Sequence, residues 1–149
     1  MPDLFTHTAV AYFIVRANAL EKYRALFYIG TVLPDVLSRP FYILFPHTFR
    51  ITTAIHTPVF IYLFCLLLAQ LFKDNKTAFI ALIGGSALHF ILDVFQRHII
   101  GGYYWFFPFS WKSFEIGMFW PEDALWSVPF LFFLVIITET FLQFKENKN

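Results

Sequence analysis

Five residues of the types that ligate metal ions stand in or beside apolar stretches of the chain: His7, Asp35, His56, His89 and Asp93. His89 and Asp93 are four residues apart, so on a helix they lie on one face, one turn above the other. Imidazole and carboxylate groups are costly in an apolar environment, by a few kcal/mol each on membrane-insertion scales. Their presence in such stretches therefore requires a partner that compensates this cost.

Three imidazoles and two carboxylates are ligands for Zn²⁺ or a similar first-row ion. They can fill one site, or serve two ions with a carboxylate bridging. Water bound to such an ion becomes hydroxide near neutral pH and attacks an ester or phosphoester. Ordinary interpretations stay open: a hydrogen-bonded pair of His89 and Asp93, a turn residue at Asp35, and a capping residue at His56 before Pro58. His7 alone would be a common core histidine.

The composition indicates a membrane protein. Of 149 residues, 58% are hydrophobic, 22% are aromatic and only 14% are charged, whereas soluble domains have about 25% charged residues. The net charge of +1 comes without a basic block, which argues against a nucleic-acid partner. Cys65 is the only cysteine, so no intrachain disulfide is possible. The length suits a single domain, 1–149.

Three segments predict membrane-spanning helices: Ile51–Phe72, Thr77–Gln96 and Ala124–Phe144. The second contains Gly84-Gly85-Ser86, which favours close contact with another helix. The third contains Pro129, where we expect a kink.

Two further segments precede these three, Leu4–Leu20 and Ala25–Leu37. The second of them holds Gly30 and Pro34, so it either spans at an angle or enters the membrane and turns back. The fold class predicted is an all-α integral membrane bundle of about four to five hydrophobic helices.

Alternating passage through the membrane sorts the charged residues onto two sides. The side of the turn at residues 73–76 receives Lys22, Arg24, Lys73, Lys76, Lys145 and Lys148; the other receives Arg39, Arg50, Arg97 and Lys112. Positive charge is enriched in short cytoplasmic loops, so the first side is expected to be cytoplasmic. The five candidate ligands fall near the opposite ends of their segments. The site is therefore expected to face the extracytoplasmic side.

Three arginines lie on the same side as the candidate ligands: Arg39, Arg50 and Arg97. Each either extends to the membrane interface or clamps a phosphate or carboxylate. We take Arg50 and Arg97 as the candidate catalytic residues that stabilise charge on a substrate. His47 and His98 are either solvated interface residues, outer ligands or proton shuttles.

A long aromatic segment, residues 98–123, follows the fourth span and lies on the same side. It is typical of an interfacial aromatic belt, or it forms a lid that admits a lipid-like substrate. Pro121-Glu122-Asp123 has the pattern of a helix start. Glu115, Glu122 and Asp123 remain alternative acids.

The order of these motifs resembles a known family. The motifs are Thr6-His7, Gly30-x-x-x-Pro34-Asp35, His56-Thr57, Gly84-x-x-x-x-His89-x-x-x-Asp93, and Gly102 followed by the aromatic run 103–109. They resemble the membrane-bound metal-dependent hydrolase family of bacteria and archaea, and more distantly the zinc-dependent phospholipase C fold. The chain departs from the family pattern at Ala54-Ile55, where a His-Arg pair is common, and at Thr57, where Ser is common.

The resemblance implies a protein of the bacterial or archaeal cell membrane with a divalent metal cofactor. The metal expected is zinc, as one or two ions, with manganese or iron as alternatives. The positions carried over as metal ligands are His7, Asp35, His56, His89 and Asp93.

The function predicted is metal-dependent hydrolysis of a phosphoester or ester, on a lipid or on a substrate close to the membrane, with metal-bound hydroxide as the nucleophile. The partners expected are the lipid bilayer and that substrate, and the oligomeric state stays open. Two alternatives belong to other classes: a membrane transporter of metal ions or protons, and a protein in which the metal only holds helices together.

Overall fold

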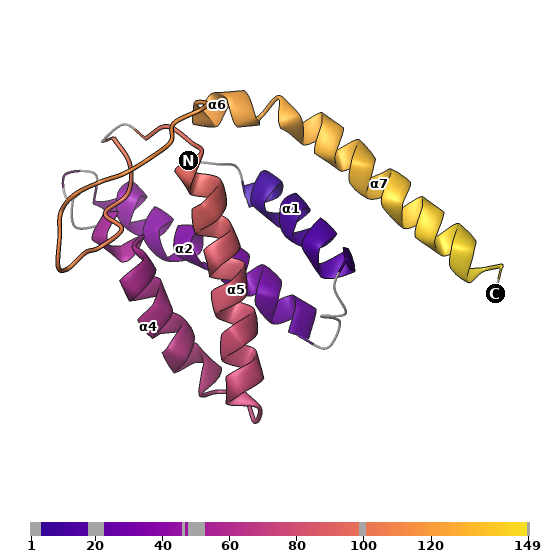
Figure 1. Ribbon diagram of the computed structural model, residues 1–149, viewed down its shortest axis with the longest axis horizontal. Coiled ribbons are helices and arrows are strands. Elements are labelled where there is room, and N and C mark those ends of the chain that lie inside the picture. Colours follow the sequence, from indigo (N-terminus) through magenta and orange to yellow (C-terminus); the bar gives the residue numbers. More distant parts are fainter. Residues whose placement is uncertain (1–3, 18–22, 46, 48–52, 99–100, 149) are drawn as a thin grey trace.

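The computed structural model of the chain is all-α in the parts that it describes, which are residues 4–17, 23–45, 47, 53–98 and 101–148. Figure 1 shows its helices: α1 (Leu4–Ala17), α2 (Arg24–Leu44), α4 (Pro58–Ala69), α5 (Asn75–Val94), α6 (Pro121–Ala124) and α7 (Ser127–Glu146). The predicted all-α class is confirmed. Within the described ranges, two stretches are long and apolar enough to cross a membrane, Asn75–Val94 and Glu122–Lys145. The expected bundle of four to five spanning helices is supported for these two only.

α2 and α5 form the centre of the fold and pack against each other more extensively than any other pair of helices. A Cβ atom added to Gly30 would lie 2.1 Å from the carbonyl oxygen of Leu82, and one added to Gly85 would lie 2.1 Å from that of Phe27. The two backbones therefore touch, which only residues without a side chain permit. Ser86 joins the contact because its hydroxyl donates to the carbonyl oxygen of Gly30 at 2.9 Å. The predicted close helix contact is confirmed here.

α2 is longer than the sequence predicts. The segment Ala25–Leu37 is expected either to span at an angle or to enter the membrane and turn back; the structure shows one helix that continues through Pro34 to Leu44, so the chain does not turn back within it. Proline lacks the N–H that would bond the carbonyl four residues earlier, here that of Gly30. The hydroxyl of Ser86 bonds this carbonyl instead, so the interruption costs less than in an isolated helix.

The third predicted segment, Ile51–Phe72, is not one continuous helix. Residues 53–55 are helical, the chain bends at His56 and Thr57, and α4 begins at Pro58. Thr57 is extended, with φ −122° and ψ 150°, because the residue before a proline is disfavoured in helical conformation. The prediction of one continuous helix was wrong, because a new helix starts at Pro58 and the bend before it changes the direction of the chain at His56.

The last predicted segment, Ala124–Phe144, corresponds to α7, which begins at Ser127 after the short helix α6. Pro129 is the third residue of α7, so it lies in the first helical turn, where its missing N–H leaves no hydrogen bond unmade. The interruption of the helix lies just before Pro129, at residues 125–126, and α7 continues without interruption from Ser127 to Glu146. The helix start predicted at Pro121-Glu122-Asp123 is confirmed as α6, where the Asp123 carboxylate accepts from the backbone N–H of Trp120 at 2.9 Å.

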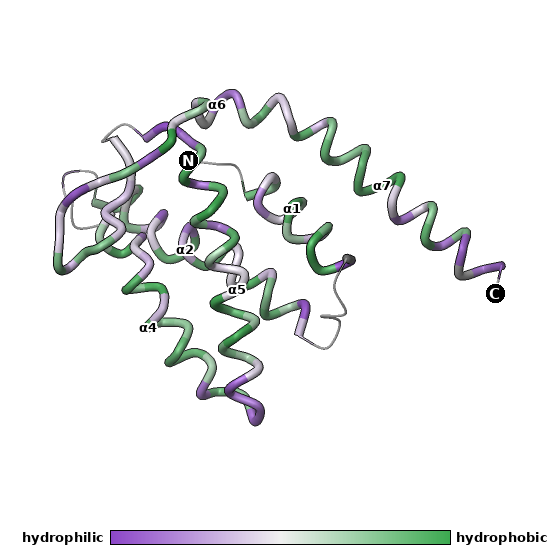
Figure 2. Tube along the Cα trace, viewed as in Figure 1, coloured by the Kyte–Doolittle hydropathy of each residue, from purple (hydrophilic) through white to green (hydrophobic). Residues whose placement is uncertain are grey.

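α7 is attached to the rest of the molecule through α1. Near its C-terminal half, Glu139 accepts a hydrogen bond from the Tyr12 hydroxyl at 2.5 Å and pairs with the Arg16 guanidinium. Figure 2 shows hydrophobic residues along most of α4, α5 and α7, and hydrophilic residues at the turn between α4 and α5. This distribution agrees with helices that cross an apolar layer and with the turn between α4 and α5 lying at one edge of that layer.

The segment of residues 101–120, called here the aromatic segment, lies across the C-terminal end of α5. The backbone N–H groups of Ile116 and Met118 donate to the carbonyl oxygens of Val94 and Phe95, each at 2.7 Å. Two isolated bridges, Gln96 with Phe119 and Tyr103 with Phe114, hold it further. The segment thus covers the end of α5 that carries His89 and Asp93.

The contact of α2 with α5 predicts a sharp difference between neighbouring glycines. Gly85→Ala should lower the free energy of unfolding by about 1–3 kcal/mol, because the new Cβ collides with the backbone of α2. Gly84→Ala is the matched control, since its Cβ would lie 3.4 Å from the Phe27 ring, and alanine favours a helix over glycine by about 1 kcal/mol. Thermal unfolding in detergent measures both. Equal melting temperatures for the two variants would contradict the contact.

Candidate metal centre

The five predicted metal ligands come together in the interior of the molecule. His7 lies on α1, Asp35 on α2, His56 at the bend before α4, and His89 and Asp93 on α5. None is more than 1% exposed. Among the described residues, two overlapping groups have ligand atoms that all lie within 4.8 Å of one another: His7, His89 and Asp93, and Asp35, His56 and His89. We call these five residues the His/Asp cluster.

The ring of His89 is fixed by α2. Its Nδ1 lies 2.8 Å from the carbonyl oxygen of Thr31. A carbonyl oxygen only accepts hydrogen bonds, so Nδ1 carries the hydrogen and donates. The other ring nitrogen, Nε2, is therefore an acceptor in the neutral imidazole, and it faces the cluster.

The ring of His56 is fixed in the same way by Ser38. The Ser38 hydroxyl donates to the carbonyl oxygen of Pro34 at 2.8 Å, so its oxygen accepts the hydrogen on Nδ1 of His56 at 3.1 Å. The Nε2 atom of His56 is then also an acceptor. A hydrogen-bond acceptor on the outer nitrogen is the usual arrangement for histidines that ligate metals.

Three acceptor atoms consequently face one another. Nε2 of His56 lies 3.2 Å from Nε2 of His89, and Oδ2 of Asp93 lies 3.0 Å from the former and 3.2 Å from the latter. Such lone pairs repel each other in a dry interior unless a positive species lies among them. A proton bridges two atoms at a time, whereas a metal cation serves all three. Ligand atoms of a tetrahedral zinc, bound at 2.0–2.1 Å, lie roughly 3.3 Å apart, so these residues fit zinc.

The remaining two members of the cluster extend it on either side. Oδ1 of Asp93 lies 3.4 Å from Nε2 of His7, so the two oxygens of this carboxylate face different imidazoles. Oδ2 of Asp35 accepts from the Arg39 guanidinium at 2.6 Å, while its Oδ1 lies 4.0 Å from Nδ1 of His56 and 4.0 Å from Nε2 of His89. Arg39 thus orients the Asp35 carboxylate with one oxygen toward the cluster.

Of the two predicted catalytic arginines, the structure describes Arg97 and does not bring it into the cluster. Arg97 is exposed, its Nε donates to the Gly117 carbonyl oxygen at 2.8 Å, and its guanidinium lies over the Trp120 ring. Arg50 lies outside the described residues. His47 is exposed.

Two other polar candidates, His98 and Glu115, lie around the end of α5. His98 is half-buried, donates to the carbonyl oxygen of Asp93 at 3.3 Å, and its pKa is lowered by burial. Glu115 accepts from the backbone N–H of His98 at 2.7 Å. Glu115 therefore holds the chain at this position.

Sequence reasoning missed several residues that support the cluster. Thr31 and Ser38 fix the two imidazoles, and Tyr103 stacks on His56 with ring centroids 4.5 Å apart. Helical spacing gave a usable signal for two of them, because Thr31 and Ser38 stand four residues before and three residues after Asp35. Nothing in the sequence indicates that Tyr103 returns from the aromatic segment to His56.

Gln96 is a further candidate that the sequence did not indicate. It is fully buried, and neither polar atom of its side chain has a hydrogen-bond partner within the described part of the chain. Buried amides are almost always hydrogen-bonded. Gln96 follows Asp93 by three residues, so it belongs with the polar groups at this end of α5.

Comparison with known protein families identifies a family for the chain. Residues 3–127 match the zinc dependent phospholipase C family. The chain belongs to this family. The match includes the whole His/Asp cluster and confirms the predicted relationship to zinc-dependent phospholipase C. No curated protein and no solved structure shows a significant match to the chain.

Family membership and the His/Asp cluster together identify the cofactor as a divalent metal, zinc. They also point to metal-dependent hydrolysis of lipids as the general class of activity. The expected cofactor is thereby confirmed, while the identity of each ligand stays a prediction that metal analysis can test.

Metal content separates ligands from the residues that orient them. The double variant His89→Ala, Asp93→Ala should lose its zinc, because two of the three acceptor atoms that face one another are removed. Ser38→Ala keeps every donor but removes the partner of His56 Nδ1, so zinc should bind about 10–100-fold more weakly. Elemental analysis and competition with a chelator measure the two effects. His47→Ala, an exposed histidine, is the control; zinc retained by the double variant would contradict the assignment.

Proposed function

We propose that the protein hydrolyses a phosphoester bond of a membrane lipid, with zinc held by His7, Asp35, His56, His89 and Asp93. The observation that carries the proposal is the triangle of acceptor atoms from His56, His89 and Asp93, with edges of 3.0–3.2 Å in a dry interior. Bound zinc supplies a Lewis acid and activates water near neutral pH. Membership of the zinc dependent phospholipase C family supports this reaction class.

The position of the cluster along α5 supports a lipid substrate. His89 and Asp93 lie in the last two turns of the 20-residue helix Asn75–Val94. Such a helix is about 30 Å long, close to the thickness of the hydrocarbon layer. Its end therefore lies near the level of the lipid head groups, where the phosphoester of a phospholipid is found.

The reaction follows from the chemistry of the bond. Water adds across a phosphorus–oxygen bond: its oxygen joins phosphorus, the bond to the lipid alcohol breaks, and the released alcohol oxygen takes a proton. The protein contributes by holding its donors rigid. Thr31 and Ser38 fix the two imidazoles, Arg39 fixes Asp35, and Tyr103 covers His56, so no reorganisation is needed when charge develops.

One alternative keeps a specific observation in its favour. The cluster connects α1, α2, the bend before α4 and α5, so zinc would also hold these elements together. In that case the metal contributes stability and the protein has no turnover. Transport is favoured less, because the buried residues of α1 between His7 and Arg16 are apolar: Ala9, Ala11 and Val15.

Hydrolysis is tested with purified protein in mixed micelles of phosphatidylcholine, phosphatidylethanolamine or phosphatidylglycerol. Wild-type protein should release a phosphorylated head group and leave diacylglycerol. A chelator should abolish the release and zinc should restore it. Asp93→Ala should fall to background, whereas His47→Ala should keep wild-type activity.

The same samples distinguish catalysis from a structural role. Zinc that only holds helices together would raise the melting temperature in detergent without any product from any of the three lipids. Release of the head group by the chelated protein would contradict a zinc-dependent reaction.

A further inference from the structure

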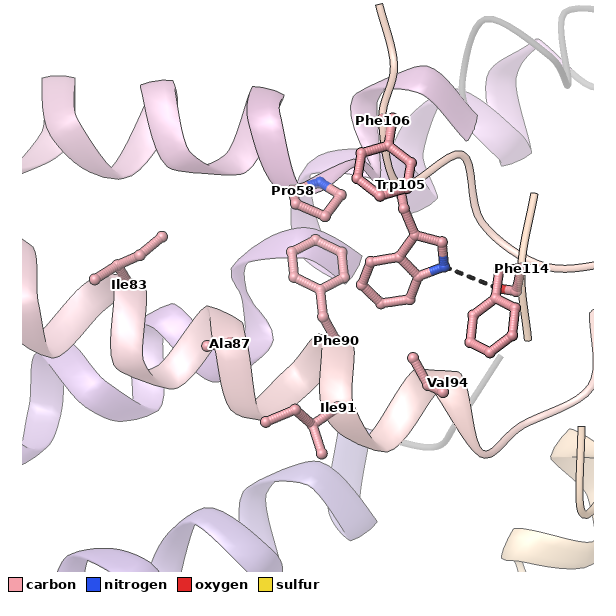
Figure 3. A pocket seen from close by; sticks show the side chains of 9 residues that line it. All are labelled: Pro58, Ile83, Ala87, Phe90, Ile91, Val94, Trp105, Phe106 and Phe114. Carbon is pink, nitrogen blue, oxygen red and sulfur yellow. Dashed lines mark hydrogen bonds between the residues drawn. The ribbon is translucent and has the colours of Figure 1, made fainter. Parts of the chain in front are cut away.

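An apolar groove runs along α5 beside the His/Asp cluster. Its volume is about 600 Å³, within the range of pockets that bind small molecules. Five residues of α5, Pro58 at the start of α4 and three residues of the aromatic segment line it (Figure 3). We propose that this groove binds one acyl chain of the lipid substrate while the phosphoester lies at the cluster, an inference that rests on the function proposed above.

The lining offers nothing to a polar ligand. Its one side-chain polar group is the indole N–H of Trp105, which already donates to the carbonyl oxygen of Phe114 at 2.8 Å. Figure 3 shows this bond at the side of the groove. Every other lining side chain is hydrocarbon, so a hydrocarbon occupant matches the groove and a charged or hydroxylated one does not.

The groove and the cluster lie on either side of one side chain, Phe90. Phe90 lines the groove, and its ring packs edge-on against His56 and His89, with centroids 5.6 Å and 5.8 Å away. The Trp105 ring lies 5.8 Å from the same phenyl ring. A molecule in the groove is therefore separated from the donors by a single phenyl ring.

The length of the groove fits one leaflet of a membrane. Its α5 residues extend from Ile83 to Val94, which is roughly 16 Å along a helix axis. Half of a hydrocarbon layer of about 30 Å is about 15 Å. The cluster lies toward the Val94 end, so an acyl chain that follows α5 has its head-group end beside the donors.

Photocrosslinking tests the groove without depending on turnover. The probe is a phosphatidylcholine with a diazirine at the end of one acyl chain, mixed in detergent micelles with the zinc-loaded protein. The diazirine stays on the acyl chain before and after hydrolysis, so the adducts report chain binding in either case. Because the acyl chain end lies at the Ile83 end of the groove, away from the cluster, adducts are expected on the peptide that contains residues 83–87.

A pair of matched variants completes the test. Ala87→Trp fills the groove from an exposed position of α5, and Ala25→Trp makes the same change at an exposed position of α2 outside it. Ala87→Trp should lose these adducts and lower kcat/KM on a dipalmitoyl phosphatidylcholine by at least about tenfold, since each displaced methylene weakens binding. Its kcat/KM on the water-soluble dibutyryl analogue should change less than about twofold. Ala25→Trp should match wild type throughout.

The outcomes separate the groove from the function. Adducts spread evenly over the exposed helices, or retained in Ala87→Trp, would overturn the groove as a chain site. Absence of hydrolysis by wild type, with adducts confined to the groove and lost in Ala87→Trp, would overturn the proposed reaction and leave the binding site standing.

Discussion

The contact between the backbones of α2 and α5 is the constraint on which the rest of the structure depends. No Cβ fits at Gly30 or Gly85, and this absence lets the Thr31 carbonyl oxygen reach Nδ1 of His89 at 2.8 Å. Were the helices separated by the width of a methyl group, that bond would be lost and the His89 ring would be free to turn. The geometry of the metal centre is therefore a consequence of helix packing, and the glycines act on it without touching it.

Pro34 of α2 adds a hydrogen bond to the contact between α2 and α5. Pro34 leaves the Gly30 carbonyl without its helical partner, and Ser86 of α5 supplies a hydroxyl to it. The carbonyl of Pro34 itself accepts from Ser38, which leaves the Ser38 oxygen able to accept from His56. A residue that weakens an isolated helix is thus used to connect α2 to α5 and to orient a metal ligand.

The sequence predicted the helical class and the convergence of the five donors, because apolar length and the side on which each donor falls are both local properties. It failed where a tertiary contact decides the outcome. The helix continues through Pro34 because Ser86 bonds the carbonyl that the proline leaves without a partner. The bend before Pro58 is set by proline geometry, which an uninterrupted run of apolar residues does not indicate. Arg97 follows α5 at the end that carries Asp93, as predicted, but its bond to the Gly117 carbonyl oxygen of the aromatic segment holds it at the surface. Tyr103 could not be predicted, since it reaches His56 from a segment without helical or strand periodicity.

Phe90 shows how a polar centre and an apolar groove can share one wall. The positive edge of an aromatic ring interacts favourably with the electron-rich face of another, and the T-shaped contacts of Phe90 with His56 and His89 bring a hydrocarbon surface against the imidazoles without exposing their nitrogens. The nitrogens that bear lone pairs face Asp93. Excluding water from the imidazole faces strengthens every electrostatic interaction within the cluster. The same ring that presents hydrocarbon to a lipid chain thereby keeps the donors in the dry surroundings on which tight metal binding depends.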